Sequence, residues 1–441
     1  MTDVMEQITA LLPNCAAVTA LVKSMSTNHT ATFVVDEKGQ STETTSQTFM
    51  DSNSCHDPFA AIPAKPAVYA CFAVDGRPII TATTANLRRA LQNRLAGPPA
   101  VSVRINYAEI TDTIRYRRVG SAFAASWWYY QIVRVLFPDC YPTMLAWKPA
   151  WFLTVTPEMD FPRWKISKAL APASAITIGP LLTYRKASEL VAAIEELFDL
   201  CRYYAILRKA PRGQACAYKE LGQCPAPCDG SISMADYRRL ISSAADFLAD
   251  AIGARKQWMH HQKCTMRAAA AAMDFRGAAR HKSKLDQAER LCHDELMAVH
   301  NMDKWKYLIL QRGKTRRWVA PFVAGPGGMA ALPEVKDCTA VAALDAWRTV
   351  GNAEMLASSH IAKAPLEEIA ALVAYHQHRS HDAGLYIPMD GDMEADTIRQ
   401  SVQTWLAANA DYDMPEINSS DLAGAGSTAE DQPLSSGDDA P

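Results

Sequence analysis

Four cysteines within a 28-residue segment constrain the fold of this chain more than any other feature. Their spacing is Cys201-x14-Cys216-x7-Cys224-x3-Cys228, and two prolines lie between the last pair. Four thiolates in so short a segment can bind zinc or an iron–sulfur cluster. The alternative is four unrelated core residues, because free cysteine is among the most buried residue types. The spacing favours a Cys-rich metal module and leaves the identity of the metal open.

Whether such cysteines form disulfides or remain reduced depends on the cellular compartment. The N-terminus carries Asp3 and Glu6, where a secretory signal would carry positive charge. The chain also has no run of about 18 uncharged apolar residues, so we expect no membrane-spanning helix. These features predict a cytoplasmic protein, in which cysteines usually stay reduced.

The charge of the chain is unevenly distributed along its 441 residues. The formal net charge is −2, but residues 412–441 contain seven acids and no base, so the remainder carries +5. Residues 201–290 contain 16 Lys and Arg against 8 Asp and Glu. A local excess of this kind is typical either of nucleic-acid contact or of solvated basic helices. The tryptophans could stack on unpaired bases, although core packing is the commoner role.

Hydrophobic patterning predicts an α+β protein. Strands are expected at 67–74 and 78–83 around an Asp75-Gly76 turn, followed by a helix at 86–95, a third strand at 101–105 and a helix at 120–137. Further strands are expected at 152–155 and 163–167, and helices at 186–200 and from Ser233 onwards. A helix is also expected at 4–23, interrupted at Pro13, and an Ala-rich helical hairpin within 262–299.

Two of these segments carry a family pattern. AVY at 67–69 and GRPIITATTANLRRAL at 76–91 resemble a GIY-YIG nuclease domain, as found at the front of the excinuclease UvrC. Phe161-Pro162-Arg163 and Ile178-Gly179-Pro180 resemble later stretches of that family, in the same order. The cysteine segment resembles the family's Cys-rich region, and the resemblance implies a [4Fe–4S] cluster on Cys201, Cys216, Cys224 and Cys228, with zinc as the alternative.

The resemblance also indicates a degenerate nuclease site. In the family a tyrosine activates water, a Glu holds one divalent metal, and Lys and Arg stabilise phosphoryl charge. Tyr69 keeps the first tyrosine. The second tyrosine, the lysine, the arginine and the metal-binding glutamate fall on Ile80, Thr83, Ala90 and Tyr129 in that order. Since Mg²⁺ prefers anionic oxygen ligands, Tyr129 cannot replace a carboxylate. We therefore expect a pseudo-nuclease without a catalytic divalent metal.

The helical hairpin resembles a UVR motif, by which UvrC meets UvrB. The resemblance assigns partner binding to Met266, Phe275, Ala278 and Ala279. The chain has Arg276 where the family has Glu, which leaves the partner open. It is UvrB, a related repair protein or a second copy of the chain. Alternatively, the segment is a plain amphipathic hairpin without a partner. No RNase H-like carboxylate pattern or helix-hairpin-helix pair is recognisable after the hairpin.

The expected architecture combines a small mixed β-sheet with helices, a Cys-rich metal module, a helical hairpin and a further α/β unit. The segments are an N-terminal extension (1–62), a GIY-YIG-like domain (63–145), connecting strands with the metal module (146–232), a helical region with the hairpin (233–300), an unassigned unit (301–410) and an acidic disordered tail (411–441).

Three functions are compatible with this organisation. The first is a DNA-binding or scaffolding protein of nucleotide excision repair without nuclease activity. The second is an active repair endonuclease that cuts phosphodiester bonds with a divalent metal, and the third is an iron–sulfur redox-sensing partner module. For the first, the candidate phosphate contacts are Lys209, Arg212, Lys219, Arg255, Lys256 and Lys263.

Overall fold

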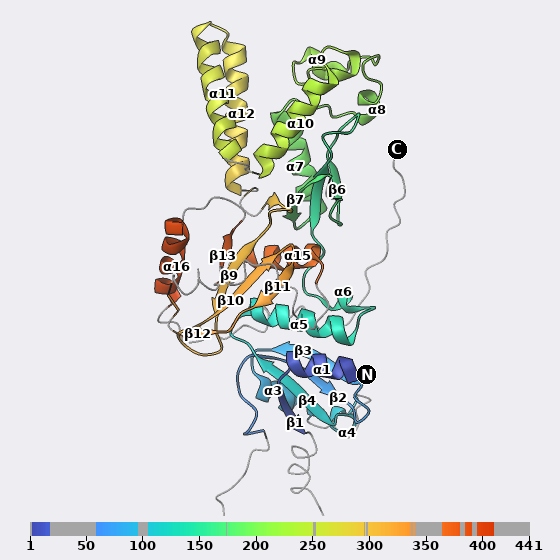
Figure 1. The fold of residues 1–441 in the computed structure, drawn as a ribbon, viewed down its shortest axis with the longest axis vertical. Coiled ribbons are helices and arrows are strands. Elements are labelled where there is room, and N and C mark those ends of the chain that lie inside the picture. Colours follow the sequence, from blue (N-terminus) through green and yellow to red (C-terminus); the bar gives the residue numbers. More distant parts are fainter. Residues whose placement is uncertain are drawn as a thin grey trace, which may run out of the picture. The chain divides into compact units, whose positions relative to one another are not determined.

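A computed structural model describes residues 2–17, 59–95, 105–172, 174–249, 253–294, 296, 299–336, 338–339, 364–379, 384–389 and 395–409. The chain divides into two compact units. The first contains Met1–Ala146 with Gly313–Arg316, and the second contains Trp147–Arg312 and Arg317–Asp411. The elements of both are labelled in Figure 1. The expected acidic tail lies outside the described residues.

The first unit is built on a four-stranded sheet with the order β1-β4-β2-β3. Its strands are β1 (Asn14–Ala17), β2 (Ala67–Phe72), β3 (Pro78–Thr84) and β4 (Thr113–Arg118). The turn between β2 and β3 uses Gly76 at φ 80°, a conformation that glycine adopts without steric cost. All its pairings are antiparallel, which corrects the mixed sheet expected from the sequence. A tight turn joins β2 to β3 and can only produce an antiparallel pair.

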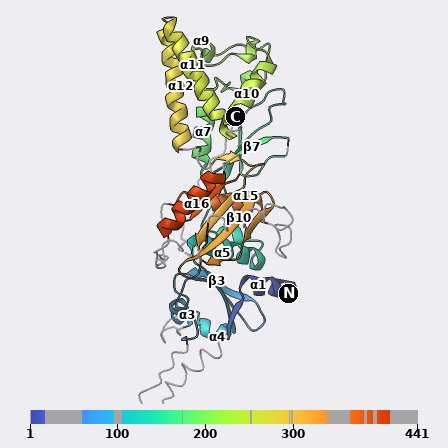
Figure 2. The same cartoon turned by 60° about the vertical axis from the view of Figure 1, so that its left-hand side comes forward.

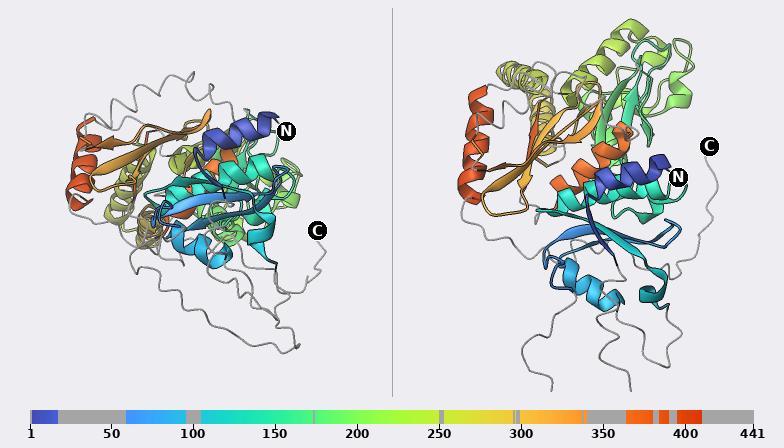
Figure 3. Two further views of the ribbon diagram at one scale, coloured as in Figure 1. Left: turned by 90° about the horizontal axis from the view of Figure 1, so that it is seen from below. Right: turned by 60° about the horizontal axis from the view of Figure 1, so that its bottom comes forward.

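Helices cover both faces of this sheet (Figure 3). α3 (Leu87–Leu95) buries its leucines against one face, together with Tyr69. α5 (Ala122–Leu136) packs on β2 and β3 from the other face, and α1 (Thr2–Leu11) packs beside α5. Ser121 begins α5 by accepting a hydrogen bond from the Ala124 amide, as an N-cap serine does. The short helices α4 (Tyr107–Ile110) and α6 (Tyr141–Met144) complete the unit.

The N-terminal segment differs from the sequence expectation. The helix expected at 4–23 ends at Leu11, and Asn14–Ala17 forms β1 at the edge of the sheet instead. Pro13 separates the two elements, since proline lacks an amide proton and breaks a helix. Arg117 of β4 holds the end of α1 by donating to the Ala10 carbonyl at 2.6 Å. The strand expected at 101–105 falls outside the described residues except for Ile105, which is in no strand, and the strand that follows β3 is Thr113–Arg118.

The second unit begins with a four-stranded antiparallel sheet of order β6-β5-β7-β8. Its strands are β5 (Trp151–Val155), β6 (Lys165–Ser167), β7 (Ile176–Leu181) and β8 (His300–Asn301). Gly179 of β7 lies against Phe152, and a Cβ there would be 2.5 Å from the phenyl ring. α7 (Tyr184–Leu197) and α10 (Met234–Ala249) bury their apolar faces in the same core as Leu153, Val155 and Ile178.

A loop-rich segment containing the four cysteines, here called the cysteine module (Leu200–Gly230), lies between α7 and α10. It holds α8 (Tyr204–Leu207), α9 (Ala217–Glu220) and the 3-10 turn η1 (Pro227–Asp229). The Lys219 ammonium group pairs with the Asp229 carboxylate at 2.5 Å and so joins α9 to η1.

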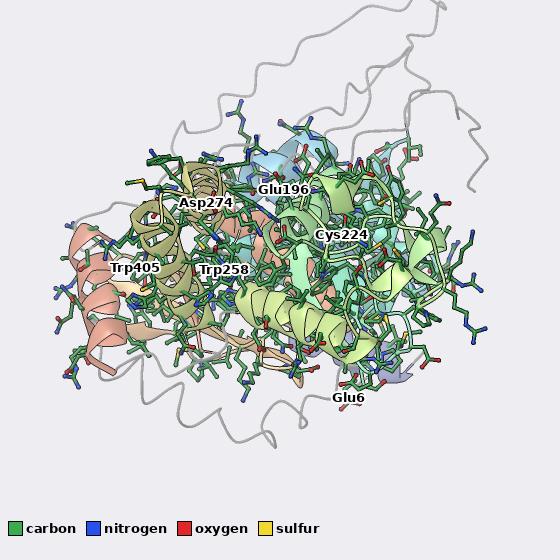
Figure 4. The ribbon with its side chains drawn as sticks, turned by 90° about the horizontal axis from the view of Figure 1, so that it is seen from above. Glu6, Glu196, Cys224, Trp258, Asp274 and Trp405 are labelled. Carbon is green, nitrogen blue, oxygen red and sulfur yellow. The ribbon has the colours of Figure 1, made fainter. Side chains whose placement is uncertain are left out.

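The helical hairpin expected from the sequence consists of α11 (Ala254–Ala271) and α12 (Phe275–Asp294). The two helices lie side by side in Figures 1 and 2. Trp258, labelled in Figure 4, lies near the start of α11. It packs on Phe198 and Phe247, which fixes the base of the hairpin to the core of the unit. The Ala-rich sequence predicts a helical hairpin within 262–299, whereas the first helix of the hairpin already begins at Ala254.

The rest of the second unit is a further sheet with the order β11-β10-β9-β13. It comprises β9 (Tyr307–Arg312), β10 (Trp318–Gly325), β11 (Gly328–Ala331) and β13 (Leu385–Pro388), and β12 (Val335–Lys336) pairs with β10. α16 (Ala395–Asn409) packs on β13 through Ile398 and Val402. α15 (Leu366–Gln377) is almost wholly buried and contacts β7 and β11.

Candidate functional site

Tyr69, the one catalytic candidate that the sequence matches to a family tyrosine, lies in the interior of the first unit. Its side chain is 1% exposed and packs with Leu87, Leu91 and Leu95 of α3. Burial raises the pKa of the hydroxyl above the ordinary tyrosine value, and Arg94 partly opposes this shift. A hydroxyl in this position is shielded from the phosphate of a bound nucleic acid.

Arg94 is a neighbour of Tyr69 that sequence comparison overlooks. Its guanidinium group hydrogen-bonds the Tyr69 hydroxyl, and it sits four residues after Ala90 on α3. Residues four apart lie on the same face of a helix, so Arg94 occupies the face that Ala90 would have used. That i+4 spacing is the signal by which it could have been found.

The remaining nuclease positions are divided between the two faces of the sheet. Ile80 pairs with Cys71, and Cys71 shares the α3 face with Tyr69. Thr83 pairs with Val68, which points to the opposite face because successive strand residues alternate. Tyr129 is buried in α5, and burial raises its pKa to about 12. These side chains carry neither a carboxylate nor a cation at the expected positions.

Three of the four cysteines are buried together in the cysteine module. Cys201, Cys224 and Cys228 are 8%, 7% and 2% exposed, and Cys216 is half-buried at the N-cap of α9. The Cys201 thiol donates to the Tyr203 carbonyl at 3.6 Å. Its interaction with Cys224 lowers the pKa of Cys224 and raises that of Cys201. Burial raises the pKa of Cys228, and the nearby charges of Asp229 and Cys224 raise it by a smaller amount.

Local backbone geometry directs amide groups at two of these sulfurs. The Ala226 amide hydrogen-bonds the Cys224 sulfur, and the amides of Cys228 and Asp229 hydrogen-bond Cys228. Ala226 adopts φ 54°, which is uncommon for a residue with a Cβ and stores strain between the two cysteines. Amide-to-sulfur hydrogen bonds stabilise thiolates and tune iron–sulfur groups. The donor set therefore fits a thiolate-bound metal or cluster.

The geometry is not that of a closed metal site. Within the described ranges, no group of three or more His, Cys, Asp or Glu side chains is arranged to hold a metal ion. The interaction of Cys201 with Cys224 and the charge effect of Cys228 on Cys201 place these three sulfurs near one another. Cys216 is joined to them through α9 and the Lys219–Asp229 pair.

The six candidate phosphate contacts differ in their surroundings. Lys209, Arg212 and Lys256 are exposed to solvent. Lys219 pairs with Asp229, and Lys263 lies 3.9 Å from Glu289. Arg255 donates to the Phe247 and Leu248 carbonyls and so caps the end of α10. The structure thus places three candidates on the cysteine module and three on α11.

The candidate partner residues lie on the hairpin. Phe275 is 71% exposed at the start of α12, next to Met273 at 78%. Ala279 is exposed, whereas Met266 and Ala278 are half-buried. Exposed apolar side chains at a hairpin tip are typical of a protein contact.

Comparison with known proteins relates the second unit to a repair family. Residues 150–247 match the family described as "UvrC/Cho excinuclease, middle domain". This segment contains β5, β7, α7, the cysteine module and most of α10. No solved structure matches the chain.

The chain is also similar to proteins named UvrABC system protein C. The Moorella thermoacetica protein is 23% identical over 242 residues, which cover 54% of this chain and 38% of that protein. The Geotalea daltonii protein is 27% identical over 237 residues, covering 53% and 37%. The Syntrophotalea carbinolica protein is 31% identical over 144 residues, covering 31% and 22%. The chain thus spans less than two fifths of the length of these relatives.

Among the described residues, no helix combines the length and the apolar character needed to cross a membrane.

Proposed function

We propose that this chain is a UvrC-like DNA-binding or scaffolding protein of nucleotide excision repair that does not cut DNA at its GIY-YIG-like site. The observation that carries the proposal is the match of residues 150–247 to the middle domain of that family. The matched segment holds the cysteine module and the basic residues Lys209 and Arg212, so it is the part of the chain best suited to contact DNA.

The environment of Tyr69 supports the loss of incision. A general base or water-activating group must lie within hydrogen-bonding reach of the reacting atoms. Tyr69 is 1% exposed within an apolar core, and its hydroxyl is already engaged by Arg94. Tyr129 offers a buried phenol where a divalent metal requires a carboxylate. Metal binding and phosphoryl stabilisation are therefore both unsupported at this site.

The basic surface supports DNA binding. Lys209, Arg212 and Lys256 are exposed and can neutralise phosphate charge. Each such contact releases condensed counterions, so binding should weaken steeply as salt increases. Lys219 and Lys263 are near carboxylates, and Arg255 caps α10, so these three should contribute less.

The cysteine module is proposed to hold a [4Fe–4S] cluster, with zinc as the alternative. Cys201, Cys224 and Cys228 would supply three thiolates, and Cys216 at the N-cap of α9 would supply the fourth. A bound cluster or zinc ion would fold the module around itself, because metal binding in such sites contributes directly to folding. The residues themselves provide thiolates, amide-to-sulfur hydrogen bonds and exclusion of water.

The hairpin is proposed to bind UvrB or a related repair protein. Exposed Phe275 and Met273 at its tip provide an apolar contact, and Arg276 beside them favours an acidic partner surface.

An incision assay combined with a gel shift tests the central proposal. The full chain is incubated with a lesion-containing duplex and Mg²⁺ or Mn²⁺, with and without UvrA and UvrB, while a parallel salt series measures binding. We expect shifted but uncut DNA, and a double variant Lys209→Ala, Arg212→Ala that binds more weakly. Metal-dependent nicking that disappears in Tyr69→Phe would overturn the pseudo-nuclease. Weak binding with a flat salt response would overturn the DNA-binding role.

Two alternatives each rest on one observation. The position of Arg94 one helical turn after Ala90 on α3 would allow an active endonuclease with a relocated arginine, and nicking that is lost in Arg94→Ala would support it. The contact between the Cys201 and Cys224 thiols favours a redox-sensing partner module. Alanine variants of Cys216 and Cys224 discriminate, because only the redox role predicts an output that depends on oxidation and is separable from DNA binding.

A further inference from the structure

Two exposed tyrosines in the second unit each pack on a half-buried aromatic ring that also contacts a cation. Tyr184, 56% exposed, contacts Trp151 edge to face with ring centroids 5.1 Å apart, and the Lys168 ammonium group lies 4.8 Å over Trp151. Tyr203, 49% exposed, packs on Tyr218 at 5.9 Å, and the Arg202 guanidinium group lies 4.2 Å over Tyr218. Each stack therefore runs from a cation through a half-buried ring to an exposed ring.

The two stacks belong to segments that contain bases and no acids. Residues 161–188 include five Lys or Arg and no Asp or Glu, and residues 201–219 have the same counts. The first segment includes β6 and the first turn of α7, and the second includes α8 and α9. The first turn of α7 carries Arg185 and Lys186, although a helix N-terminus favours negative charge. A bound phosphate would offset that unfavourable placement.

A third contact of the same kind joins the two segments. Arg163, which precedes β6, places its guanidinium group 4.0 Å over the ring of Tyr204 in α8. Lys168 follows β6, so cation–ring pairs stand at both ends of this edge strand. Four residues lie between Arg163 and Lys168, which sets their separation along the strand direction at no more than about 17 Å. The exposed side chain of Lys165 lies between them.

We propose that this surface binds single-stranded DNA, with Tyr184 and Tyr203 as stacking platforms for unpaired bases. This inference rests on the proposed DNA-binding function and names the form of DNA that the second unit recognises. Exposed aromatic rings beside a track of cations are the recurring means of binding single strands, because every base presents a flat face. The face of a base within a duplex is covered by its neighbours, so the tyrosines add little to duplex binding.

The ring stacks position the tyrosines before DNA arrives. Trp151 and Tyr218 each hold an exposed tyrosine on one side and a cation nearby, which restricts the side chain and lowers the entropy lost on binding. Acidic peptides could also bind the cations, but they would gain nothing from flat exposed rings. The surface therefore fits unpaired nucleotides better than an acidic protein.

Fluorescence anisotropy with the full chain tests the proposal. The probes are a labelled oligothymidylate and a duplex of the same length, each titrated over a salt series. Tyr184→Ala and Tyr203→Ala should each weaken binding to the oligothymidylate by about five- to a hundredfold, and duplex binding by less than about twofold. Tyr184→Phe and Tyr203→Phe retain the ring and should bind as the parent chain does. Lys168→Ala should reduce the salt slope by about one.

Ile105→Ala supplies the control, since Ile105 is a 62% exposed apolar residue outside both acid-free segments. Thermal unfolding of each variant confirms that the fold is retained. Unchanged oligothymidylate binding in both alanine variants, with binding still reduced in Lys209→Ala, Arg212→Ala, overturns this inference and leaves the proposed function standing. Failure of the parent chain to bind either probe overturns both, and an equal loss on both probes also overturns the preference for single strands.

Discussion

The Lys284 ammonium group donates to the Asp199 carboxylate at 2.8 Å, and this contact joins α12 of the hairpin to the end of α7. The same ammonium group donates to the Leu197 carbonyl at 2.9 Å, and Arg280 adds a second ion pair to Asp199 at 2.7 Å. The Lys284 side chain is only 12% exposed. Burial lowers the pKa of Lys284, which Asp199 partly restores. Asp199 also lies near enough to Cys224 to influence its pKa. The Asp199 carboxylate therefore fixes the hairpin to the end of α7 through Lys284 and Arg280.

Removal of that carboxylate should loosen the hairpin. Asp199→Ala leaves a largely buried ammonium group with one neutral partner, so we expect the free energy of unfolding to fall by about 1–3 kcal/mol. Hydrogen exchange should accelerate in α12 before it does in α10. Glu189→Ala is the control, because it breaks an exposed pair with Arg185 and should change stability by less than about 0.5 kcal/mol. Equal unfolding midpoints for the two variants would show that the Asp199 contact contributes nothing to docking.

Tyr69 should behave as a core residue in stability measurements. Tyr69→Ala empties space between β2 and the leucines of α3, so we expect a loss of about 3–5 kcal/mol. Tyr69→Phe keeps the ring and loses only the hydrogen bond to Arg94, which should cost about 0.5–1.5 kcal/mol. Val74→Ala, at an 88% exposed position in the turn between β2 and β3, provides the comparison in urea unfolding. A Tyr69→Ala variant as stable as Val74→Ala would mean that the residue is not packed in the core.

Elements with strong apolar periodicity could be predicted from the sequence, and elements stabilised by distant contacts could not. The spacing of apolar residues in α5 and α7 is sufficient to identify them, whereas α11 buries no residue completely and begins eight residues before the expected hairpin. β4 reads Thr-Ile-Arg-Tyr-Arg-Arg and buries only Ile114 completely, so its sequence lacks the alternation of a strand. Its cations are accommodated by tertiary contacts: Arg117 lies 4.0 Å from the Trp128 ring and caps α1.

The same distinction applies to the candidate site. Cysteine spacing predicts that Cys201, Cys216, Cys224 and Cys228 bind one metal or cluster, and this stays a prediction, because no group of three or more such side chains in the described part of the chain is arranged to hold an ion. β7 is not predicted from the sequence, because Gly179-Pro180 interrupts its apolar run. Gly179 is nevertheless needed there for close packing on Phe152. The contact between Asp199 and Lys284 spans 85 residues and carries no local signature. Arg94 could have been identified, since it follows Ala90 by one helical turn.

The proposed metal group predicts a specific dependence on the module's cysteines. Cys224→Ser and Cys228→Ser each replace a thiolate with a weaker ligand, so we expect the purified chain to lose at least half of its bound metal. Cys264→Ser is the control, because Cys264 is exposed on α11 beside His260 and lies outside the module. Analysis of iron, zinc and acid-labile sulfide per chain checks the outcome. Iron with sulfide identifies a cluster, zinc without sulfide identifies the alternative, and equal metal content in all three variants would contradict the assignment.

Acidification should weaken the hairpin through His281. Its ring hydrogen-bonds the Gln262 side chain of α11 at 2.7 Å. Burial, followed by the charges of Lys284 and Arg280, holds the pKa of His281 below its ordinary value of 6.5. The native state therefore binds fewer protons than the unfolded state in this range, so stability rises with pH. It should fall as the pH drops from about 7.5 through the folded-state pKa, and the loss is complete below that value.

A comparison of histidine variants isolates this effect from the other histidines of the chain. His281→Gln keeps a hydrogen-bonding side chain without a titratable group, so its unfolding free energy should depend less on pH in this interval than that of the parent. His260→Gln, at an exposed position on α11, should retain the parent's slope. Urea unfolding followed at several pH values between about 5 and 8 supplies the slopes. Identical slopes for the parent and His281→Gln would show that protonation of His281 is not linked to folding of the hairpin.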